Sequence, residues 1–130
     1  MSLLYRVIPR KNPLKPDEPA KYYAQPFSRG AITVEQLLDA VCEETTLNRD
    51  EARMAVNRIF KKAGDFIELG FNVQLGDLGY IHTTLKSIGA DKPEEVTATR
   101  ITDIVPRFVF GKKLRDRIKD TKLERDVQHP

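Results

Sequence analysis

The sequence predicts one domain of mixed α+β class, and three patterns lead to that prediction. Between residues 48 and 70, apolar side chains recur at steps of three and four, which places them on one face of a helix. After residue 70 the apolar positions alternate, as they do in strands that bury one face. Near the N-terminus, Pro13, Pro16 and Pro19 separate two short stretches of β-forming residues.

Length and composition favour a cytoplasmic protein. The 130 residues suit one domain with a modest core. The chain lacks a run of about eighteen apolar residues, the length of a transmembrane helix, and its start lacks the apolar segment of a signal peptide. Cys42 is the only cysteine, which excludes an internal disulfide.

The net charge of +3 is unevenly distributed along the chain. Residues 1–32 carry six basic and two acidic residues, and residues 105–130 carry eight and four. Residues 33–70 carry five basic and eight acidic residues, and residues 71–104 carry three and five. Basic ends suit a polyanion such as DNA, and a mildly positive solvated surface is an equally good interpretation of the charge alone.

Residues 1–32 predict a β-hairpin extension, with two strands on either side of the proline-rich loop. Pro9 and Pro26 confine these strands to sheet edges, because proline cannot donate a ladder hydrogen bond. Tyr22 and Tyr23 are compatible with base stacking or with ordinary half-buried strand packing. We favour packing.

A pair of amphipathic helices follows the extension. Thr33 and Gln36 form a capping-box pattern at the start of the first helix. Asn48 and Glu51 form the same pattern at the start of the second, and Gly70 predicts its end. Helix-turn-helix DNA readers contain such a pair, but here the second helix begins with acidic residues and is long and apolar, so we do not favour that interpretation.

The second helix carries more apolar surface than one short neighbour can cover. Phe60, Phe66 and Ile67 lie on its apolar face. Covering them requires the preceding helix, a following sheet, or a second copy of the chain.

The rest of the chain predicts strands and a short last helix. Residues 72–85 read as two strands around a glycine turn, and residues 100–110 read as a further strand in which Pro106 marks an edge or a bulge. Gly111 releases the chain into a charged helix. We expect residues 123–130 to form a flexible tail.

No pattern in the sequence indicates catalysis. The chain has no glycine-rich phosphate loop, no metal-ligand cluster, and no Ser/His/Asp set in a plausible context. His82 has no second ligand at metal-binding spacing and reads as a surface strand residue. We therefore expect no enzyme activity, no metal, no cofactor and no small-molecule substrate.

Three signals in register resemble the bacterial HU/IHF family of histone-like DNA-binding proteins. One is V-Q-L followed by a glycine turn and an apolar strand, from Val73 to Ile81. Another is V-P-x-F-x-x-G-K-x-L, from Val105 to Leu114. The third is the spacing between them, which suits two long strands and a tip. The match runs from Thr33 to about Lys119 and assigns residues 33–122 to an HU/IHF-like domain.

The resemblance implies a fold and a function. The implied fold is two N-terminal helices, a three-stranded antiparallel sheet with projecting β-arms, and a short C-terminal helix. Proteins of this kind form intertwined homodimers whose arms embrace double-stranded DNA in the minor groove and bend it. The implied role is nucleoid-associated and architectural, with low sequence specificity. The residues expected in the dimer core are Phe60, Phe66, Ile67, Leu78, Ile81 and Phe108.

The resemblance also implies where DNA is contacted. Pro93 lies near the position of the proline that wedges between base pairs. Arg100 and Arg107 are seven residues apart, so period two sends them to opposite faces unless Pro106 introduces a bulge. The residues expected to contact phosphates are Arg100, Arg107, Lys112, Lys113 and Arg115.

The arm departs from the family pattern. Glu94 and Glu95 directly follow Pro93, and these carboxylates disfavour entry into a DNA groove. The alternative is local: Asp91 caps a single helical turn that starts at Pro93. We favour this shortened or folded-back arm.

The N-terminal extension is the second departure, and it resembles an extended HU-like subgroup. It can cover a sheet edge, or bring Arg6, Arg10, Lys11 and Lys15 to the saddle-shaped DNA-binding surface that the sheet of the dimer forms in this family. The acidic arm and the extension leave an alternative function open, in which the fold serves protein–protein assembly with weak or no DNA binding.

Overall fold

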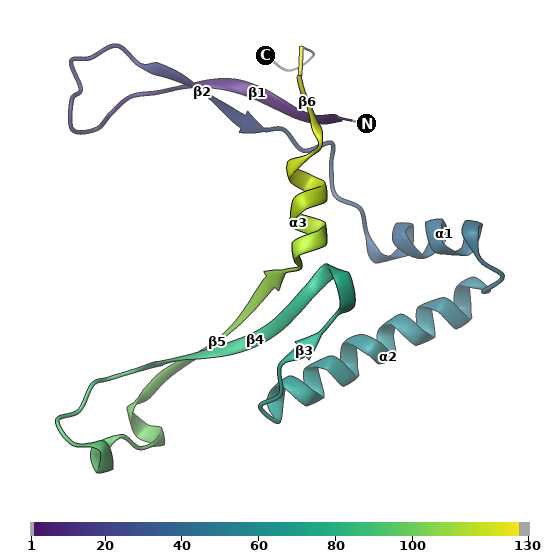
Figure 1. Cartoon of the computed structure of the whole chain (residues 1–130), viewed down its shortest axis with the longest axis vertical. Helices are drawn as coiled ribbons and strands as arrows, with labels where there is room; N and C mark the ends of the chain where they lie inside the picture. Colours follow the sequence, from purple (N-terminus) through teal and green to yellow (C-terminus); the bar gives the residue numbers. More distant parts are fainter. Residues whose placement is uncertain (1, 128–130) are drawn as a thin grey trace. The chain divides into compact units, whose positions relative to one another are not determined.

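The computed structural model describes residues 2–127, and within that range it contains three α-helices and two three-stranded sheets (Figure 1). This is the predicted mixed α+β class. The chain divides into two compact units. One consists of Glu35–Asp116, and the other combines Met1–Val34 with Arg117–Pro130. The predicted boundary after residue 32 lies close to this division, but the unit that contains the N-terminus also includes the C-terminal segment.

Helices α1 (Val34–Glu44) and α2 (Arg49–Glu68) form where the apolar spacing predicts them. The Oδ1 atom of Asn48 accepts a hydrogen bond from the backbone N–H of Glu51 at 2.8 Å, so the predicted cap of α2 is present. The chain leaves the helix at Gly70, whose φ of +91° lies in the region that favours glycine. Local signals are therefore sufficient to define both ends of α2.

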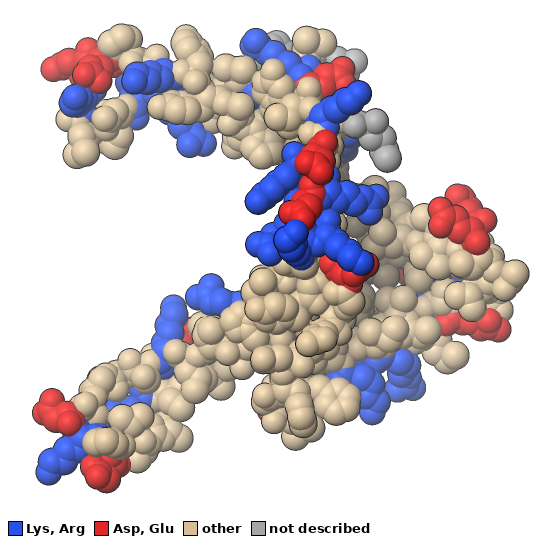
Figure 2. Space-filling view, in the orientation of Figure 1, with Lys and Arg blue, Asp and Glu red and all other residues tan. Residues whose placement is uncertain are grey.

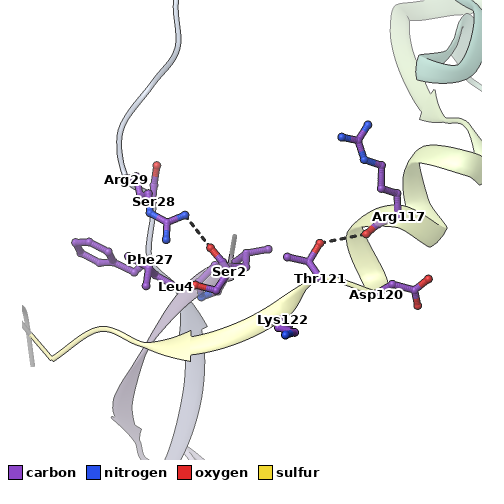
Figure 3. A pocket seen from close by; sticks show the side chains of 11 residues that line it. Ser2, Leu4, Phe27, Ser28, Arg29, Arg117, Asp120, Thr121 and Lys122 are labelled. Atoms are coloured by element: carbon purple, nitrogen blue, oxygen red, sulfur yellow. Dashed lines mark hydrogen bonds between the residues drawn. The ribbon is translucent and has the colours of Figure 1, made fainter.

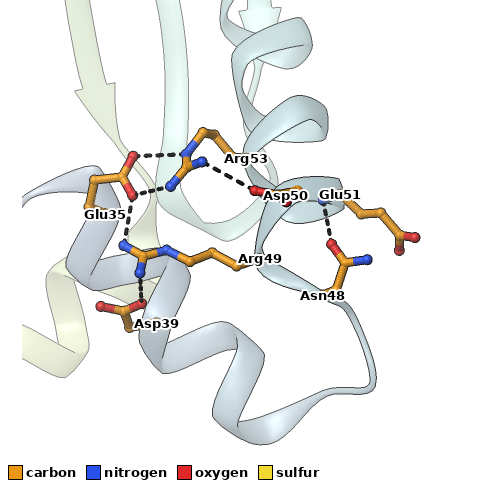
Figure 4. A network of polar contacts seen from close by, with 7 residues as sticks. All are labelled: Glu35, Asp39, Asn48, Arg49, Asp50, Glu51 and Arg53. Carbon is orange, nitrogen blue, oxygen red and sulfur yellow. Dashed lines mark hydrogen bonds and ion pairs between the residues drawn. The ribbon is translucent and has the colours of Figure 1, made fainter.

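An ion-pair network joins α1 to α2 (Figure 4). The carboxylate of Glu35 accepts hydrogen bonds from Arg53 at 2.8 and 3.1 Å and from Arg49 at 2.8 Å. Arg49 also pairs with Asp39 at 3.2 Å, and Arg53 with Asp50 at 3.4 Å. The hydrogen bonds from Arg53 and Arg49 lower the pKa of Glu35 from its ordinary value of 4.5 to about 2.

The second part of this unit is an antiparallel sheet of β3 (Val73–Gln74), β4 (Gly79–Ser87) and β5 (Ile101–Phe110), in that order. Strand β5 lies at the sheet edge, which explains how it accommodates Pro106. The register irregularity falls at Thr102, which has no partner position, and not at Pro106. Of the two predicted possibilities, an edge strand or a bulge at Pro106, the structure has the edge strand.

Two glycines allow close backbone packing where the sheet leads into α3 (Lys112–Lys119). Gly79 has φ +143°, and a Cβ there would collide with the backbone oxygen of Val109. The N–H of Gly111 donates to the carbonyl oxygen of Leu78 at 3.0 Å. These contacts fix the start of α3 against the turn that joins β3 to β4.

The core of a single chain is small. The buried apolar residues among those described are Leu38 and Ala52, at 3% and 5% exposed. On α2, Phe60 and Phe66 are 58% and 50% exposed. The other residues predicted for a dimer core divide into two groups. Ile67 and Ile81 are half-buried, whereas Leu78 and Phe108 are exposed.

The other unit contains a sheet built from both ends of the chain, which we call the terminal sheet. Its strands are β1 (Ser2–Arg10), β2 (Lys21–Pro26) and β6 (Lys122–Arg125), in the order β2-β1-β6. β1 and β2 are antiparallel, whereas β1 and β6 are parallel. β1 is the central strand, so the expectation that Pro9 confines it to a sheet edge is wrong. Pro9 is tolerated because it lies beyond the part of β1 that pairs with β6, where its missing N–H costs no bond to that strand.

The expectation of a flexible tail over residues 123–130 is therefore wrong where β6 forms. β6 pairs with β1 so that Leu123 lies opposite Leu3, and the N–H of Asp126 then donates to the carbonyl oxygen of Tyr5 at 2.8 Å. Backbone hydrogen bonds thus hold the strand in place, although Lys122–Arg125 lack the alternation of apolar residues that predicts a strand. Residues 128–130 of the expected tail lie outside the described residues.

Candidate nucleic-acid interface

Strands β4 and β5 form an arm with two unlike faces, because successive side chains of a strand point to opposite sides. The cross-strand register assigns the members of each face. The polar face consists of Tyr80, His82, Thr84, Lys86, Asp103, Val105, Arg107 and Val109. The apolar face consists of Ile81, Thr83, Leu85, Ile104, Pro106, Phe108 and Phe110.

The polar face carries the cations of the arm. Arg107 is exposed and lies opposite His82, whose ring is 5.7 Å from that of Tyr80. Further out, Lys86 lies opposite Asp103. The Asp103 carboxylate accepts a hydrogen bond from the neighbouring backbone N–H of Ile104 at 2.9 Å. The arrangement offers two basic side chains and aromatic rings on one side of the arm.

The apolar face contains two of the residues predicted for a core. Ile81 and Phe108 are directly opposite each other, and the Phe108 ring packs edge-on against Phe110 at 4.9 Å. This face continues outward to Leu85 and Ile104, both of which are exposed. The unit therefore presents an apolar side of the arm that its own residues leave largely uncovered.

Arg100 is not grouped with Arg107. One nitrogen of its guanidinium donates to the carbonyl oxygen of Gly89 at 3.1 Å, and its own carbonyl oxygen accepts from the N–H of Ile88 at 2.9 Å. Arg100 thus closes the neck of the tip that joins β4 to β5. The family resemblance assigned Arg100 to DNA. Its hydrogen bond to Gly89 depends on how the tip folds and was not predicted from the sequence.

The tip contains two single turns, η2 (Pro93–Glu95) and η3 (Ala98–Arg100). Pro93 occupies the start of the first turn, as the local interpretation predicted. The capping residue is Lys92, without a side-chain cap bond, so the expected cap by Asp91 is wrong. Both turns are exposed, and the carboxylates that follow Pro93 face solvent.

The first turns of α3 gather the remaining predicted cations. Lys112 pairs with Asp116 at 3.0 Å, and Lys113 approaches Asp77 at 3.8 Å. Both lysine side chains are more than four-fifths exposed, so water screens these pairs. Arg115 is exposed on the same helix. The three basic residues at the start of α3 are brought together, and Arg107 lies on the strand that leads into it.

Sequence reasoning missed the neighbours of Arg107 on the polar face. Tyr80 and His82 alternate with apolar residues in β4, so the period of two already placed them on one side. Their alignment with Arg107 required the register between β4 and β5, which the sequence does not state.

Charge is divided unequally between the two units. Residues 35–116 contain twelve basic and fourteen acidic residues, a net charge of −2. Residues 1–34 and 117–130 together contain ten basic and five acidic residues, a net charge of +5. Basic side chains gather over α3, and acidic and basic side chains lie side by side at the tip of the arm (Figure 2). The positive charge of the whole chain thus comes from the unit with the terminal sheet.

Residues 2–127 bring no three His, Cys, Asp or Glu side chains close enough to hold a metal ion. In the same range, no helix has the length and apolar character needed to cross a membrane.

Comparison with known families gives one match that spans most of the chain. The model of the HU-HIG family, described as an HU domain fused to wHTH, Ig, or glycine-rich motif, matches residues 1–125. No curated protein matches the sequence.

Two solved structures have similar folds. A candidate bacterial DNA-binding protein from Bacteroides vulgatus aligns with a TM-score of 0.68 and 17% identity over 95% of this chain and 48% of that one. HU from Anabaena, solved in a cocrystal with DNA, aligns with a TM-score of 0.54 and 19% identity over 68% of this chain and 99% of that one. This chain therefore spans about half the length of the Bacteroides protein.

Proposed function

The chain belongs to the HU-HIG family, and from this premise we propose that two copies form an HU-type dimer that binds double-stranded DNA. In this proposal the protein is a non-enzymatic, nucleoid-associated architectural protein that contacts the phosphate backbone and the minor groove with little base readout. The observation that carries the proposal is the two-faced arm, which places cations on one side and uncovered apolar residues on the other.

Dimerisation is supported by the apolar surface that a single chain leaves in water. Phe60 and Phe66 on α2 are half or more exposed, and Phe108 on the arm is also exposed. Burying an aromatic side chain of this kind contributes about 1.5–3 kcal/mol. A second copy of the chain supplies the cover, with α2 and the apolar face of the arm at the shared interface.

DNA binding is supported by the basic residues at the root of the arm. Arg107 on the polar face and Lys112, Lys113 and Arg115 on α3 are exposed and available to phosphates. Contacts to phosphates position a protein on the duplex and carry no direct sequence information, so this set of residues favours low sequence specificity. The similarity in fold to Anabaena HU, solved with DNA, supports the same assignment.

Pro93 remains our candidate for a minor-groove wedge, and the acidic residues beside it limit its contribution. Glu94 and Glu95 follow it in the same exposed turn. Like charges near a polyanion oppose the counterion release that supplies most of the affinity. We infer that the tip of the arm contributes less to binding than its root does.

Protein–protein assembly without DNA is the second candidate function. The net charge of −2 on residues 35–116 favours this second function, because a negatively charged unit is repelled by the DNA that an HU-type arm would have to approach. The two functions predict opposite results in a binding experiment.

The test is fluorescence anisotropy of a labelled random-sequence duplex, titrated with the full chain from about 50 to 200 mM salt. We expect binding whose affinity falls steeply as salt rises. The variant Arg107→Gln removes one proposed phosphate contact from each chain of the dimer, two in all, and lowers the magnitude of the slope of log K against log salt by about 2. Arg58→Gln, which removes an exposed charge from α2, is the matched control and leaves the slope unchanged.

Two outcomes contradict the proposal. A stable dimer that fails to bind at low salt assigns the protein to assembly. Binding that Arg107→Gln and Arg58→Gln weaken equally shows that the arm has no special part in it.

A further inference from the structure

We propose that the terminal sheet carries a second DNA-binding surface, on the side of the sheet that we call its basic face. This inference rests on the proposed function, namely that the protein binds duplex DNA. It names a site outside Glu35–Asp116, which we call the HU-like unit. The occupant is the phosphate backbone of the duplex. The basic face is defined by Arg6 and Arg10 of β1, Lys21 of β2 and Lys122 of β6.

The register of the three strands places these four residues on one side. In β1, Arg6 and Arg10 are four positions apart, an even step along the strand, so both point to the same face. Arg10 lies opposite Lys21, and Ser2 of the same face lies opposite Lys122. In an antiparallel or parallel pair, residues directly opposite each other share a face.

The other side of the terminal sheet has a different composition. Leu3, Tyr5 and Val7 alternate with the basic residues of β1 and lie opposite Leu123, Arg125 and Ala24 respectively. Arg125 is the one charged strand residue on that side. The basic face also holds Leu4 and Ile8, so apolar residues occur on both sides of the sheet, but four of the sheet's five basic strand residues lie on one side.

Basic side chains line two hollows of this unit, one near each end of β1. Arg10, Lys21 and Tyr23 line a hollow of about 100 Å³ beside the proline-rich loop, together with Glu18 of that loop. At the other end of β1, Lys122, Arg117 and Arg29 line an open hollow of about 780 Å³ (Figure 3).

The second hollow has a fixed polar wall. A guanidinium nitrogen of Arg29 donates to the carbonyl oxygen of Ser2 at 2.7 Å, and the hydroxyl of Thr121 donates to the carbonyl oxygen of Arg117 at 3.1 Å. The first bond holds Arg29 at the end of the basic face. Asp120 also lines this hollow, so its cations outnumber its one carboxylate.

Charge complementarity identifies the occupant. The unit that contains the terminal sheet has a net charge of +5, whereas the HU-like unit has −2. On the basic face one acidic strand residue, Glu124, is present, and it accepts a hydrogen bond from the Ser2 hydroxyl at 2.7 Å. The four basic residues of this face therefore exceed its one acidic strand residue, and this excess of positive charge suits a polyanion.

The dimensions also suit an extended polyanion. Arg6 and Arg10 are four residues apart, which is about 13 Å along a strand. Phosphates of one DNA strand advance by about 3.4 Å each along the helix axis, so the two arginines span several phosphates. Tyr23 and Gln25 lie between the basic positions on the same face and add hydrogen-bond donors for phosphate oxygens.

The experiment uses the full chain and the same random-sequence duplex, with Arg6→Gln, Arg10→Gln and the double variant. Arg125→Gln is the matched control, because it removes one arginine from the same sheet on the opposite face. Because each dimer carries two basic faces, we expect the magnitude of the slope of log K against log salt to fall by about 2 for each single variant and by about 4 for the double variant. Arg125→Gln keeps the slope of the unaltered chain. Arg6 and Arg10 are exposed, so melting curves are expected to stay unchanged.

The outcomes separate this inference from the proposed function. If the unaltered chain binds and the double variant binds with the same slope, the second surface is refuted while DNA binding stands. If Arg125→Gln lowers the slope as much as Arg6→Gln does, the effect is one of total charge and the basic face is refuted. If the unaltered chain does not bind, both proposals fail.

Discussion

Leu3 lies directly opposite Leu123 in a pair of parallel strands, although the two residues belong to opposite ends of the chain. Through this pairing the N-terminal extension and the C-terminal segment form one sheet. Neither end has an apolar pattern that predicts a sheet of three strands by itself. The terminal sheet is therefore a long-range feature of the fold.

Removing β6 is expected to loosen β1. A chain that stops after Thr121 loses the pairing of Ser2–Tyr5 with β6 and the bond from the Asp126 N–H to Tyr5. We expect faster hydrogen exchange of the amides of Ser2–Tyr5, with the amides of α2 unchanged. A chain that stops after Val127 keeps β6 and is the control. Equal protection in the two truncated chains would contradict the pairing.

Acid is expected to weaken the contact between α1 and α2. Hydrogen bonds from Arg53 and Arg49 lower the pKa of Glu35 from 4.5 to about 2. A lowered pKa contributes stability that is fully present above the unfolded value, and that is lost as pH falls from about 4.5 towards about 2. Glu35→Gln removes this dependence. Denaturant unfolding over that pH range measures it.

Glu43→Gln is the control for this experiment, because it removes a carboxylate from the same helix outside the network. Its unfolding curve keeps the pH dependence of the unaltered chain. If the stability of the Glu35→Gln variant falls with pH as steeply as that of the control, the pH dependence does not come from Glu35.

Gly79→Ala is expected to destabilise the HU-like unit by about 1–3 kcal/mol. The residue has φ +143°, and its added Cβ would collide with the backbone oxygen of Val109. Gly89→Ala is the matched control, because open space surrounds that position. Thermal unfolding of both variants measures the difference, and equal melting temperatures would show that β4 and β5 do not approach at Gly79.

Phe60→Ala is expected to weaken self-association. If a second copy covers this half-exposed ring, its loss costs about 3–5 kcal/mol of dimer stability. Leu14→Ala removes a more exposed apolar side chain from the proline-rich loop and is the control. Sedimentation equilibrium distinguishes them. A Phe60→Ala protein that associates as tightly as the control excludes α2 from the interface.

Neutralising the acidic tip is expected to strengthen DNA binding. Glu94→Gln with Glu95→Gln removes two exposed carboxylates beside Pro93. Exposed charge pairs are worth about 0.2–1 kcal/mol each, so removing the two carboxylates is expected to tighten binding at low salt by roughly 2- to 30-fold for each arm that reaches the duplex. Glu43→Gln with Glu44→Gln removes the same charge from exposed positions of α1 and serves for comparison. An unchanged affinity for the tip variant would indicate that the tip stays away from DNA.

The sequence predicted the elements whose causes are local. α2 is defined by apolar spacing, by the cap at Asn48 and by the stop at Gly70, all of which lie within the segment itself. The β3–β4 turn and the strand that ends before Gly111 follow from alternation and glycine in the same way.

The features that the sequence did not predict depend on contacts between distant segments. β6 consists of Lys122–Arg125, four exposed residues whose pattern carries no strand signal, and its partner is at the other end of the chain. The hydrogen bond from Arg100 to the carbonyl oxygen of Gly89 was not predicted, because it depends on how the tip folds; the predicted contact of Arg100 with DNA stays a prediction. The alignment of Arg107 with His82 follows from strand register, which depends on packing across the sheet.

In our proposal, two chains together form the unit that binds duplex DNA. Sedimentation velocity of the full chain mixed with a labelled random-sequence duplex is the decisive experiment, because mass and stoichiometry are measured on the complex itself. We expect a complex with two chains per bound unit that dissociates as salt is raised. A single chain bound to DNA, or protein and duplex that sediment separately at low salt, would contradict it.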